Sequence, residues 1–255
     1  MYDMTYQRQA YEAKFKTLPD IISNWVEPYG GVAGKDMLDF GCGEATTAIG
    51  FARNYPVRRV VGIDIMPDVH LCAPLAREML GLEKLPGNLS LHQIQPGLLH
   101  DPTETFDIIY SWSVFEHIEQ RILPSVLAQL RLALRPGGLL FVQIAPLFYS
   151  SEGAHLNHLV PEPWGHLINQ HSLYREKLRA ACSDDASFDS HWATYTTLNR
   201  ITAPALLKAI RAAGFNVLRD YTTRENLDIP TQLEGIFEPD VLLTNQVVLL
   251  AESGV

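Results

Sequence analysis

The sequence predicts an α/β fold in which a mostly parallel sheet is covered by helices on both faces. Short apolar, β-branched segments alternate with helical segments up to about residue 146, and this alternation is typical of parallel sheets. The 255 residues are 47% hydrophobic and 19% charged, so the chain can bury a large core. We expect one domain with an elaboration rather than several domains.

The predicted elements can be placed in order along the chain. Apolar periodicity predicts a first helix over residues 8–28, and strands and helices then alternate. The strands are expected at 36–40, 57–65, 89–94, 106–112 and 139–145, and the helices at 46–54, 69–80 and 119–134. A further helix over 202–213 has Thr202 as its cap, Pro204 in its first turn and Gly214 as its stop. Two last strands, near 215–222 and 246–252, are expected to form a hairpin-like pair, which gives seven strands.

The alternation is interrupted by residues 147–200, which have no clear period and contain several histidines and aromatic residues. This stretch is too long for a simple loop in a compact domain, so we expect a functional insertion, an α-rich lid. The sequence therefore divides into three parts. Residues 1–146 form a ligand-binding core with an N-terminal cap helix, residues 147–200 form the lid, and residues 201–255 complete the sheet.

Charge and composition narrow the classes of partner. The net charge of −9 disfavours a nucleic-acid partner, because phosphate binding depends on lysine and arginine. The first residues are polar, and no apolar run approaches the roughly 20 residues that cross a bilayer, so we expect no membrane span. Three cysteines without a CxxC pair suit a reducing, cytoplasmic setting. The sequence leaves the oligomeric state open, a homodimer included.

A glycine-containing turn between the first strand and the next helix predicts a ligand site. Residues 39–45 read DFGCGEA. Gly41 and Gly43 allow the backbone to turn tightly and to approach a ligand that a side chain would exclude. Asp64 ends the following strand, 21 residues after Gly43, where an acidic side chain can accept both hydroxyls of a ribose.

Two kinds of nucleotide-like ligand fit such a turn. A dinucleotide would favour a third glycine in the pattern GxGxxG, with its pyrophosphate at the helix N-terminus. This chain has no glycine at that spacing, and the Asp39 carboxylate stands just before the turn. A negative group there repels a diphosphate and suits an ammonium group. The ligand implied has a ribose and a cationic end, and no phosphate.

Four motifs in order and spacing resemble those of class I S-adenosylmethionine-dependent methyltransferases. These are MLDFGCGEATTAIGFA, VVGIDI, TFDIIYSWSVFEHI and LRPGGLLFVQIAP, which together cover most of residues 36–146. The resemblance implies a Rossmann-like seven-stranded sheet, S-adenosyl-L-methionine as cofactor and a small-molecule acceptor. The sequence departs from the family pattern at Ala45, where a third glycine is common. It also departs at Gln95, near which relatives often carry an acidic residue that faces the adenine amino group.

The resemblance also assigns roles to individual residues of this chain. Residues around the end of the first strand, together with Ser111 and Trp112 at the end of the fourth, would hold the methionine part of the cofactor. Asp64 at the end of the second strand would bind the ribose, and Ile65 would pack on the adenine. The implied cofactor-binding residues are Asp39, Gly41, Cys42, Gly43, Asp64, Ile65, Gln95, Ser111 and Trp112.

A hydroxyl acceptor also needs a base, and histidine suits neutral pH. His117 follows the fourth strand, on the side where the acceptor should lie; the alternative is that it and Glu116 cap the next helix. His155 and His158 form an HxxH pair that would share one helical turn, with structural histidines in an aromatic lid as the alternative. Glu162 is the only nearby carboxylate, and we assign no metal site.

The sequence thus predicts a methyltransferase that acts on an oxygen of a small molecule in natural-product or glycan biosynthesis. Nitrogen and carbon acceptors stay open, and the acceptor itself is not specified. Two other functions remain: an enzyme of the same fold and cofactor that performs a cyclisation or decarboxylation, and a non-catalytic regulator that binds the cofactor.

Overall fold

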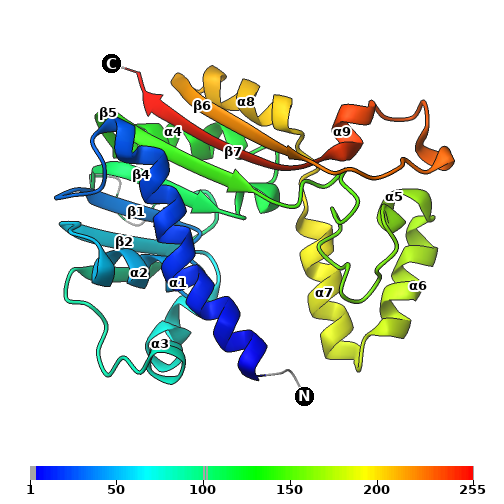
Figure 1. Cartoon of the computed structure of the whole chain (residues 1–255), viewed down its shortest axis with the longest axis horizontal. Helices are drawn as coiled ribbons and strands as arrows, with labels where there is room; N and C mark the ends of the chain where they lie inside the picture. The colour runs from blue at the N-terminus through cyan, green and yellow to red at the C-terminus, as the bar shows by residue number, and fades with distance from the viewer. Residues whose placement is uncertain (1–3, 100, 102, 255) are drawn as a thin grey trace.

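A computed structural model describes residues 4–99, 101 and 103–254, and the strands in these residues form one seven-stranded sheet (Figure 1). The strand order is β3-β2-β1-β4-β5-β7-β6. The strands are β1 (Asp36–Phe40), β2 (Arg59–Asp64), β3 (Leu89–Gln93), β4 (Phe106–Trp112), β5 (Leu134–Ile144), β6 (Phe215–Arg224) and β7 (Thr244–Ser253). The first five are parallel, and β7 runs antiparallel between β5 and β6. The predicted fold class is confirmed.

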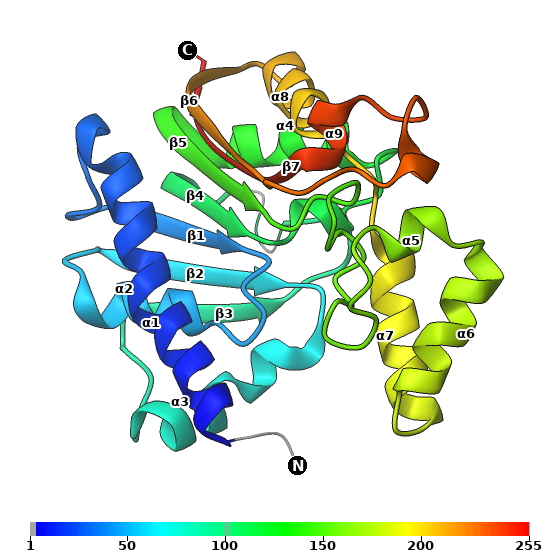
Figure 2. The same ribbon diagram turned by 45° about the vertical axis from the view of Figure 1, so that its right-hand side comes forward.

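Helices cover both faces of the sheet (Figures 1 and 2). On one face lie α1 (Met4–Val26), α2 (Thr46–Asn54) and α3 (Cys72–Leu80). Ile22 of α1 and Phe51 of α2 are fully buried there, in one cluster with side chains of β1, β4 and β5. This packing explains why the apolar stripe predicted near the end of the first helix points toward the strands.

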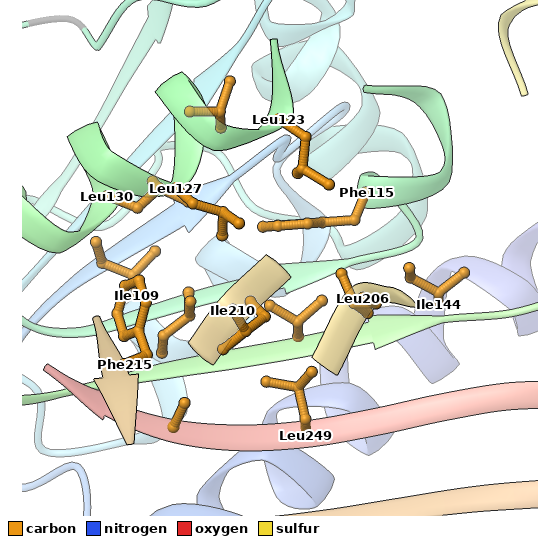
Figure 3. Close-up of a cluster of buried hydrophobic side chains, with 14 of the residues drawn as sticks. Ile109, Phe115, Leu123, Leu127, Leu130, Ile144, Leu206, Ile210, Phe215 and Leu249 are labelled. Carbon is orange, nitrogen blue, oxygen red and sulfur yellow. The ribbon is translucent and has the colours of Figure 1, made fainter. Parts of the chain in front are cut away.

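The opposite face is covered by α4 (Leu123–Ala133) and α8 (Ala203–Ala212). Figure 3 shows leucines of α4 directed at side chains of the sheet, with Leu206 and Ile210 of α8 beside them. Thr202 caps α8, because its side chain accepts a hydrogen bond from the backbone N–H of Ala205. The two layers fix the parallel strands so that their carboxyl ends meet at one edge.

The inserted segment, residues 147–200, lies beyond the carboxyl ends of the parallel strands (Figures 1 and 2). It contains α5 (Gly165–Ile168), α6 (His171–Ala181) and α7 (Asp185–Thr197), which share their own apolar cluster. Glu225, just after β6, anchors the segment. Its carboxylate accepts hydrogen bonds from the Ser151 hydroxyl at 2.7 Å and from the Asn245 amide at 3.0 Å.

Some element boundaries differ from those predicted. The helix expected over 119–134 begins at Leu123, where Pro124 occupies its first turn. The last parallel strand begins at Leu134 rather than at residue 139, and it includes the Pro-Gly-Gly stretch at residues 136–138. The pairing with β4 shifts register here, because Phe106 pairs with Leu134 and Ile108 pairs with Leu139, so the extra residues of β5 form an irregularity in the ladder.

A search of the described residues finds no helix with the length and apolar character to cross a membrane.

Candidate functional site

The glycine turn after β1 leaves room for a ligand at the carboxyl edge of the sheet. Gly41 and Gly43 have positive φ angles of 80° and 52°. A Cβ atom on Gly41 would lie 2.3 Å from Cγ2 of Val114, so the backbone must approach that side chain closely. A Cβ atom on Gly43 would have no atom within 4 Å. Gly43 therefore borders the open space that the sequence predicts for the cofactor.

Asp64 is held rigidly at the end of β2. One carboxylate oxygen accepts a hydrogen bond from the Gly43 N–H at 2.7 Å, and the other accepts one from the Met66 N–H at 2.8 Å. Each oxygen keeps a further lone pair. The side chains that follow, Ile65 and Met66, are 49% and 52% exposed. A fixed carboxylate beside exposed apolar side chains fits a ribose with a flat base attached.

Gln93 belongs to this part of the site, although the sequence did not single it out. Its side-chain amide donates a hydrogen bond to the Ile65 carbonyl at 3.1 Å, and its carbonyl lies 3.2 Å from Nε2 of His70. Gln95, the residue singled out instead, is exposed in the loop after β3. The strand register places Gln93 opposite Asp64, and the assignment of Gln95 to the adenine stays a prediction.

Cys42 packs away from the open space. Its Sγ atom lies against Gly62 of β2, where a Cβ atom would come within 3.0 Å of it. Burial raises the pKa of the Cys42 thiol, so the group stays protonated and unreactive. Cys42 thus shapes the turn by packing.

Asp39 is 4% exposed, and the hydroxyl of Tyr110 lies close to its carboxyl group. Burial raises the pKa of its carboxyl to about 8; the Tyr110 hydroxyl lowers it in part, and the Asp64 carboxylate raises it further. Tyr110 is close enough for this effect but does not complete a hydrogen bond, and Tyr11 of α1 and Thr46 of α2 also have unpartnered hydroxyls. Buried polar groups are normally hydrogen-bonded, so these hydroxyls could bind the polar end of a cofactor.

The raised pKa of Asp39 predicts that cofactor affinity increases with pH. At pH 7 the free carboxyl is mostly protonated, and a cationic ligand favours its ionised form, so binding should release a proton. We expect the Kd for S-adenosylhomocysteine to fall between pH 6 and 8, by up to about tenfold per unit, and then to level off. Calorimetry in buffers of different ionisation enthalpy measures this proton release.

Asp39→Asn is the matched control, because it keeps the size of the side chain and removes its titration. The ligand's own amino group titrates equally with both proteins, so the difference between the two pH slopes isolates Asp39. For folding the sign is opposite to that for binding. The protonated group contributes stability to the cofactor-free protein at low pH, and this contribution is lost as pH rises toward 8. Equal slopes in the two proteins would contradict the role of Asp39.

Ser111 and Trp112 end β4 next to the turn. The Ser111 side chain is fully buried, and its hydroxyl donates a hydrogen bond to the Phe40 carbonyl at 2.9 Å. This bond ties β4 to β1 at the edge, so Ser111 positions the strand ends. Trp112 is half-buried and stacks on Phe141 of β5, with ring centroids 6.2 Å apart.

Glu116, His117 and His155 form a compact cluster beyond β4. One donor atom from each lies within 4.8 Å of the other two, and the two imidazole rings meet edge to face at 5.7 Å. Glu116 and His117 belong to the short helix η3 (Phe115–His117), whereas His155 comes from the inserted segment. The structure thus brings together two of the three predicted catalytic histidines.

Burial controls the ionisation of this cluster. It raises the pKa of Glu116 to about 8 and lowers that of His117 to about 4, with His155 adding to the second shift. Burial also lowers the pKa of His155. At neutral pH the His117 ring is therefore uncharged and can accept a proton.

The hydrogen bonds of the two rings identify their free nitrogens. The Thr197 hydroxyl donates to the Thr194 carbonyl, so at its 2.7 Å contact with Nδ1 of His117 it must accept. The lone pair of His117 is then on Nε2. Nε2 of His155 lies 2.9 Å from the Pro146 carbonyl, which can only accept, so the lone pair of His155 is on Nδ1.

The other lid histidines lie elsewhere. The expectation that His155 and His158 share a helical turn is wrong, because both lie in turns and His155 has a positive φ of 61°. His158 is exposed and faces His191, with ring centroids 5.4 Å apart. His166 is buried, and its Nε2 donates to the Phe148 carbonyl at 2.6 Å, so this ring supports the segment's own core.

The inserted segment returns across the cluster at its end. The backbone N–H of Asn199 donates to the Glu116 carbonyl at 2.7 Å, and its side-chain amide donates to the Phe115 and Ile118 carbonyls at 2.6 Å each. These bonds fix η3 in place. Sequence reasoning missed Thr197 and Asn199, because residues about 80 positions apart carry no local pattern that pairs them.

A cavity of about 210 Å³ lies between the start of the inserted segment, α8, β6 and the short helix α9 (Pro239–Leu243). Leu147 and Tyr149 line it from the start of the segment, and Ile201 lines it from the point where the chain re-enters the core. Arg224 and Asp240, an ion pair at 2.5 Å, form a charged part of its wall. The cavity therefore offers apolar surface with one polar side.

Comparisons with known proteins agree with this geometry. Residues 6–220 match a family model described as a methyltransferase domain. Ubiquinone biosynthesis O-methyltransferase of Pseudomonas fluorescens is 31% identical over 134 residues, which cover 51% of this chain and 54% of that protein. Trans-aconitate 2-methyltransferase of Rhodopseudomonas palustris is 25% identical over 224 residues, with 78% and 81% covered. The chain thus matches about half the length of the ubiquinone relative.

A solved structure shares the fold over nearly the whole chain. Magnesium protoporphyrin IX methyltransferase from Synechocystis PCC 6803, with bound S-adenosylhomocysteine, superposes with a TM-score of 0.57 at 14% sequence identity. The superposition covers 99% of this chain and 88% of that protein.

Proposed function

This chain belongs to the methyltransferase domain family, and from that premise we propose that it transfers a methyl group from S-adenosylmethionine to an oxygen atom of a small molecule. The observation that carries the proposal is the cluster of Glu116, His117 and His155, whose free lone pairs lie beyond β4, where an acceptor would meet the cofactor. The similarity to an enzyme named as an O-methyltransferase supports an oxygen acceptor.

The residues of the glycine turn suit the parts of the cofactor. Asp64 would accept the ribose hydroxyls, Ile65 would pack on the adenine, and Asp39 would face the cationic amino-acid end beside Gly43. When bound, S-adenosylmethionine supplies a methyl group on a positively charged sulfur. As the acceptor oxygen bonds to the methyl carbon, the carbon–sulfur bond breaks and its electron pair stays on sulfur.

A hydroxyl acceptor must lose its proton as the new bond forms, and we assign the Glu116, His117 and His155 cluster to this task. His117 offers an uncharged ring with its lone pair on Nε2, and His155 offers Nδ1. We leave His158 out of the assignment, since its side chain is exposed and faces His191 instead.

The inserted segment is assigned as the lid over the acceptor. His155 places it at the cluster, and the cavity between Leu147, Tyr149 and Ile201 offers apolar surface for the non-reacting part of the acceptor. This surface favours a natural product with an apolar ring system over a glycan. The first 146 residues then hold the cofactor, and the last strands complete the sheet that supports both.

Mass spectrometry tests the proposed function. We expect the full chain, supplied with ¹³C-methyl S-adenosylmethionine and hydroxylated aromatic acceptors, to produce an acceptor heavier by one labelled CH₂ unit. One S-adenosylhomocysteine should appear per product, and the ¹³C chemical shift should be that of a methoxy group. A product of unchanged mass would instead indicate a cyclisation. Cofactor binding without turnover of any acceptor would indicate a regulator. A ¹³C chemical shift typical of an N-methyl or C-methyl group would refute the oxygen assignment.

A further inference from the structure

We propose that Glu116, His117 and His155 form a binding site for a divalent first-row transition metal ion. The three residues supply one carboxylate and two imidazoles, and one donor atom from each lies within 4.8 Å of the other two. The sequence did not predict this set, because it considered only Glu162 as a carboxylate for the lid histidines. Glu162 instead binds Lys177 at 2.6 Å and Asn169 at 2.9 Å.

Glu116 is the observation that points to a ligand. Its side chain is 3% exposed, and neither carboxyl oxygen has a hydrogen-bond partner among the described residues. Native proteins satisfy buried polar groups with few exceptions, and a buried carboxyl group without a partner costs free energy whether it is protonated or ionised. Its backbone carbonyl accepts a hydrogen bond from the Asn199 N–H at 2.7 Å, which fixes the backbone that carries this side chain. A cation between Glu116 and the two rings would satisfy it.

The two histidines are arranged as metal ligands commonly are. A metal-bound histidine usually donates its other ring N–H to a carbonyl or another acceptor, which fixes the tautomer and the orientation of the ring. Here His155 donates to the Pro146 carbonyl, and His117 donates to the Thr197 hydroxyl. Each ring therefore keeps one lone pair that is free for a cation.

Binding of a metal ion would require the three donor atoms to move slightly closer together. Two ligands of one zinc ion, each at about 2.0–2.1 Å from it, lie about 3.4 Å apart in a tetrahedral site. The donor atoms here are within 4.8 Å, so each would move by on the order of 1 Å or less toward the ion. Imidazole ligands favour zinc and its first-row neighbours over magnesium and calcium, which prefer oxygen.

Three protein ligands leave at least one coordination position open, as in catalytic rather than structural sites. This step rests on the proposed function: an acceptor hydroxyl bound at the open position would become more acidic and would release its proton to solvent. The lone pair of His117 would then hold the metal instead of receiving the proton. Because His155 belongs to the lid, the ion would also join the lid to the core.

Zinc binding to the full chain tests the site without any acceptor. After removal of metals with a chelator, calorimetry with Zn²⁺ should show one strong site per chain, and Zn²⁺ should raise the Tm. Co²⁺ in its place should give visible absorption bands from nitrogen and oxygen ligands. Glu116→Gln and His155→Ala should each weaken Zn²⁺ binding by at least about 100-fold, since even outer-shell changes cost 10- to 100-fold.

The control is His158→Ala, which removes a lid histidine three positions from His155 and should bind Zn²⁺ as the wild type does. Retained binding of S-adenosylhomocysteine by Glu116→Gln shows that this variant is folded. The proposal is overturned if the wild type takes up no Zn²⁺, or if Glu116→Gln binds it equally well.

Activity separates this proposal from the proposed function. Methyl transfer at full rate by the metal-free protein would overturn the catalytic use of the ion and leave the proposed function intact. One bound Zn²⁺ that depends on Glu116, together with no turnover of any acceptor, would support the metal site and contradict the proposed function.

Discussion

Alanine at position 117 is expected to slow methyl transfer by at least about 100-fold, the usual contribution of a positioned acid–base group. Nε2 of His117 carries the free lone pair, and the ring is uncharged at neutral pH because burial lowers its pKa to about 4. The substitution removes that lone pair both as a proton acceptor and as a metal ligand. Single-turnover measurements with saturating cofactor should show the loss in the rate of methyl transfer.

The effect should be confined to chemistry. The Kd for S-adenosylhomocysteine should stay unchanged in His117→Ala, because the residues that we propose for the cofactor lie in the turns after β1 and β2. His155→Ala should slow methyl transfer by a similar factor. His171→Ala, in an exposed position at the start of α6, should keep the wild-type rate. If His117→Ala turns over as fast as the His171 variant, the cluster has no part in the reaction.

The second large effect concerns Asp64, and it should appear in binding. Asp64→Ala removes the carboxylate that accepts hydrogen bonds from the N–H groups of Gly43 and Met66, and with it the acceptor that we propose for the ribose hydroxyls. Leaving such groups unpaired costs about 1–3 kcal/mol, which corresponds to a rise in Kd of about 5- to 150-fold. Calorimetric titration with S-adenosylhomocysteine measures it directly.

Two further variants sharpen this measurement. Asp64→Asn keeps one acceptor oxygen and should lose less affinity than alanine does. Asp220→Ala removes an exposed carboxylate of β6, far along the sheet order from β2, and should bind as the wild type does. An Asp64→Ala protein with wild-type affinity would remove Asp64 from the cofactor site.

The parts of the site that a short stretch of sequence determines were predictable. The turn from Gly41 to Gly43 needs backbone conformations that glycine favours. Asp64 ends a strand of consecutive apolar residues, a pattern that predicts a buried strand of a parallel sheet. Local residue preferences therefore predicted the glycine turn and the acidic end of β2. The start of β5 was missed, because Leu134 pairs with Phe106 of β4 before the irregular Pro-Gly-Gly stretch, and that pairing leaves no local pattern in the sequence.

The cluster around Glu116 could not be predicted in the same way. Its environment depends on Asn199 and Thr197, which return from the far end of the inserted segment. The spacing of His155 and His158 indicated a helical pair, but the turn at His155 directs the two rings to different neighbours. Contacts between segments far apart in the sequence produce no periodic residue pattern from which they could be predicted.

The path of the inserted segment bears on how such enzymes diverge. The chain leaves the sheet at Leu147 and returns at Ile201, and both residues are buried in the same apolar cluster with Ile144. A replacement of different length could therefore join the same two points without moving Gly43 or Asp64. Exchange of this one segment would change the acceptor preference while the proposed cofactor-binding residues stay the same. An enzyme could therefore acquire a new substrate by a single recombination event rather than by many separate mutations.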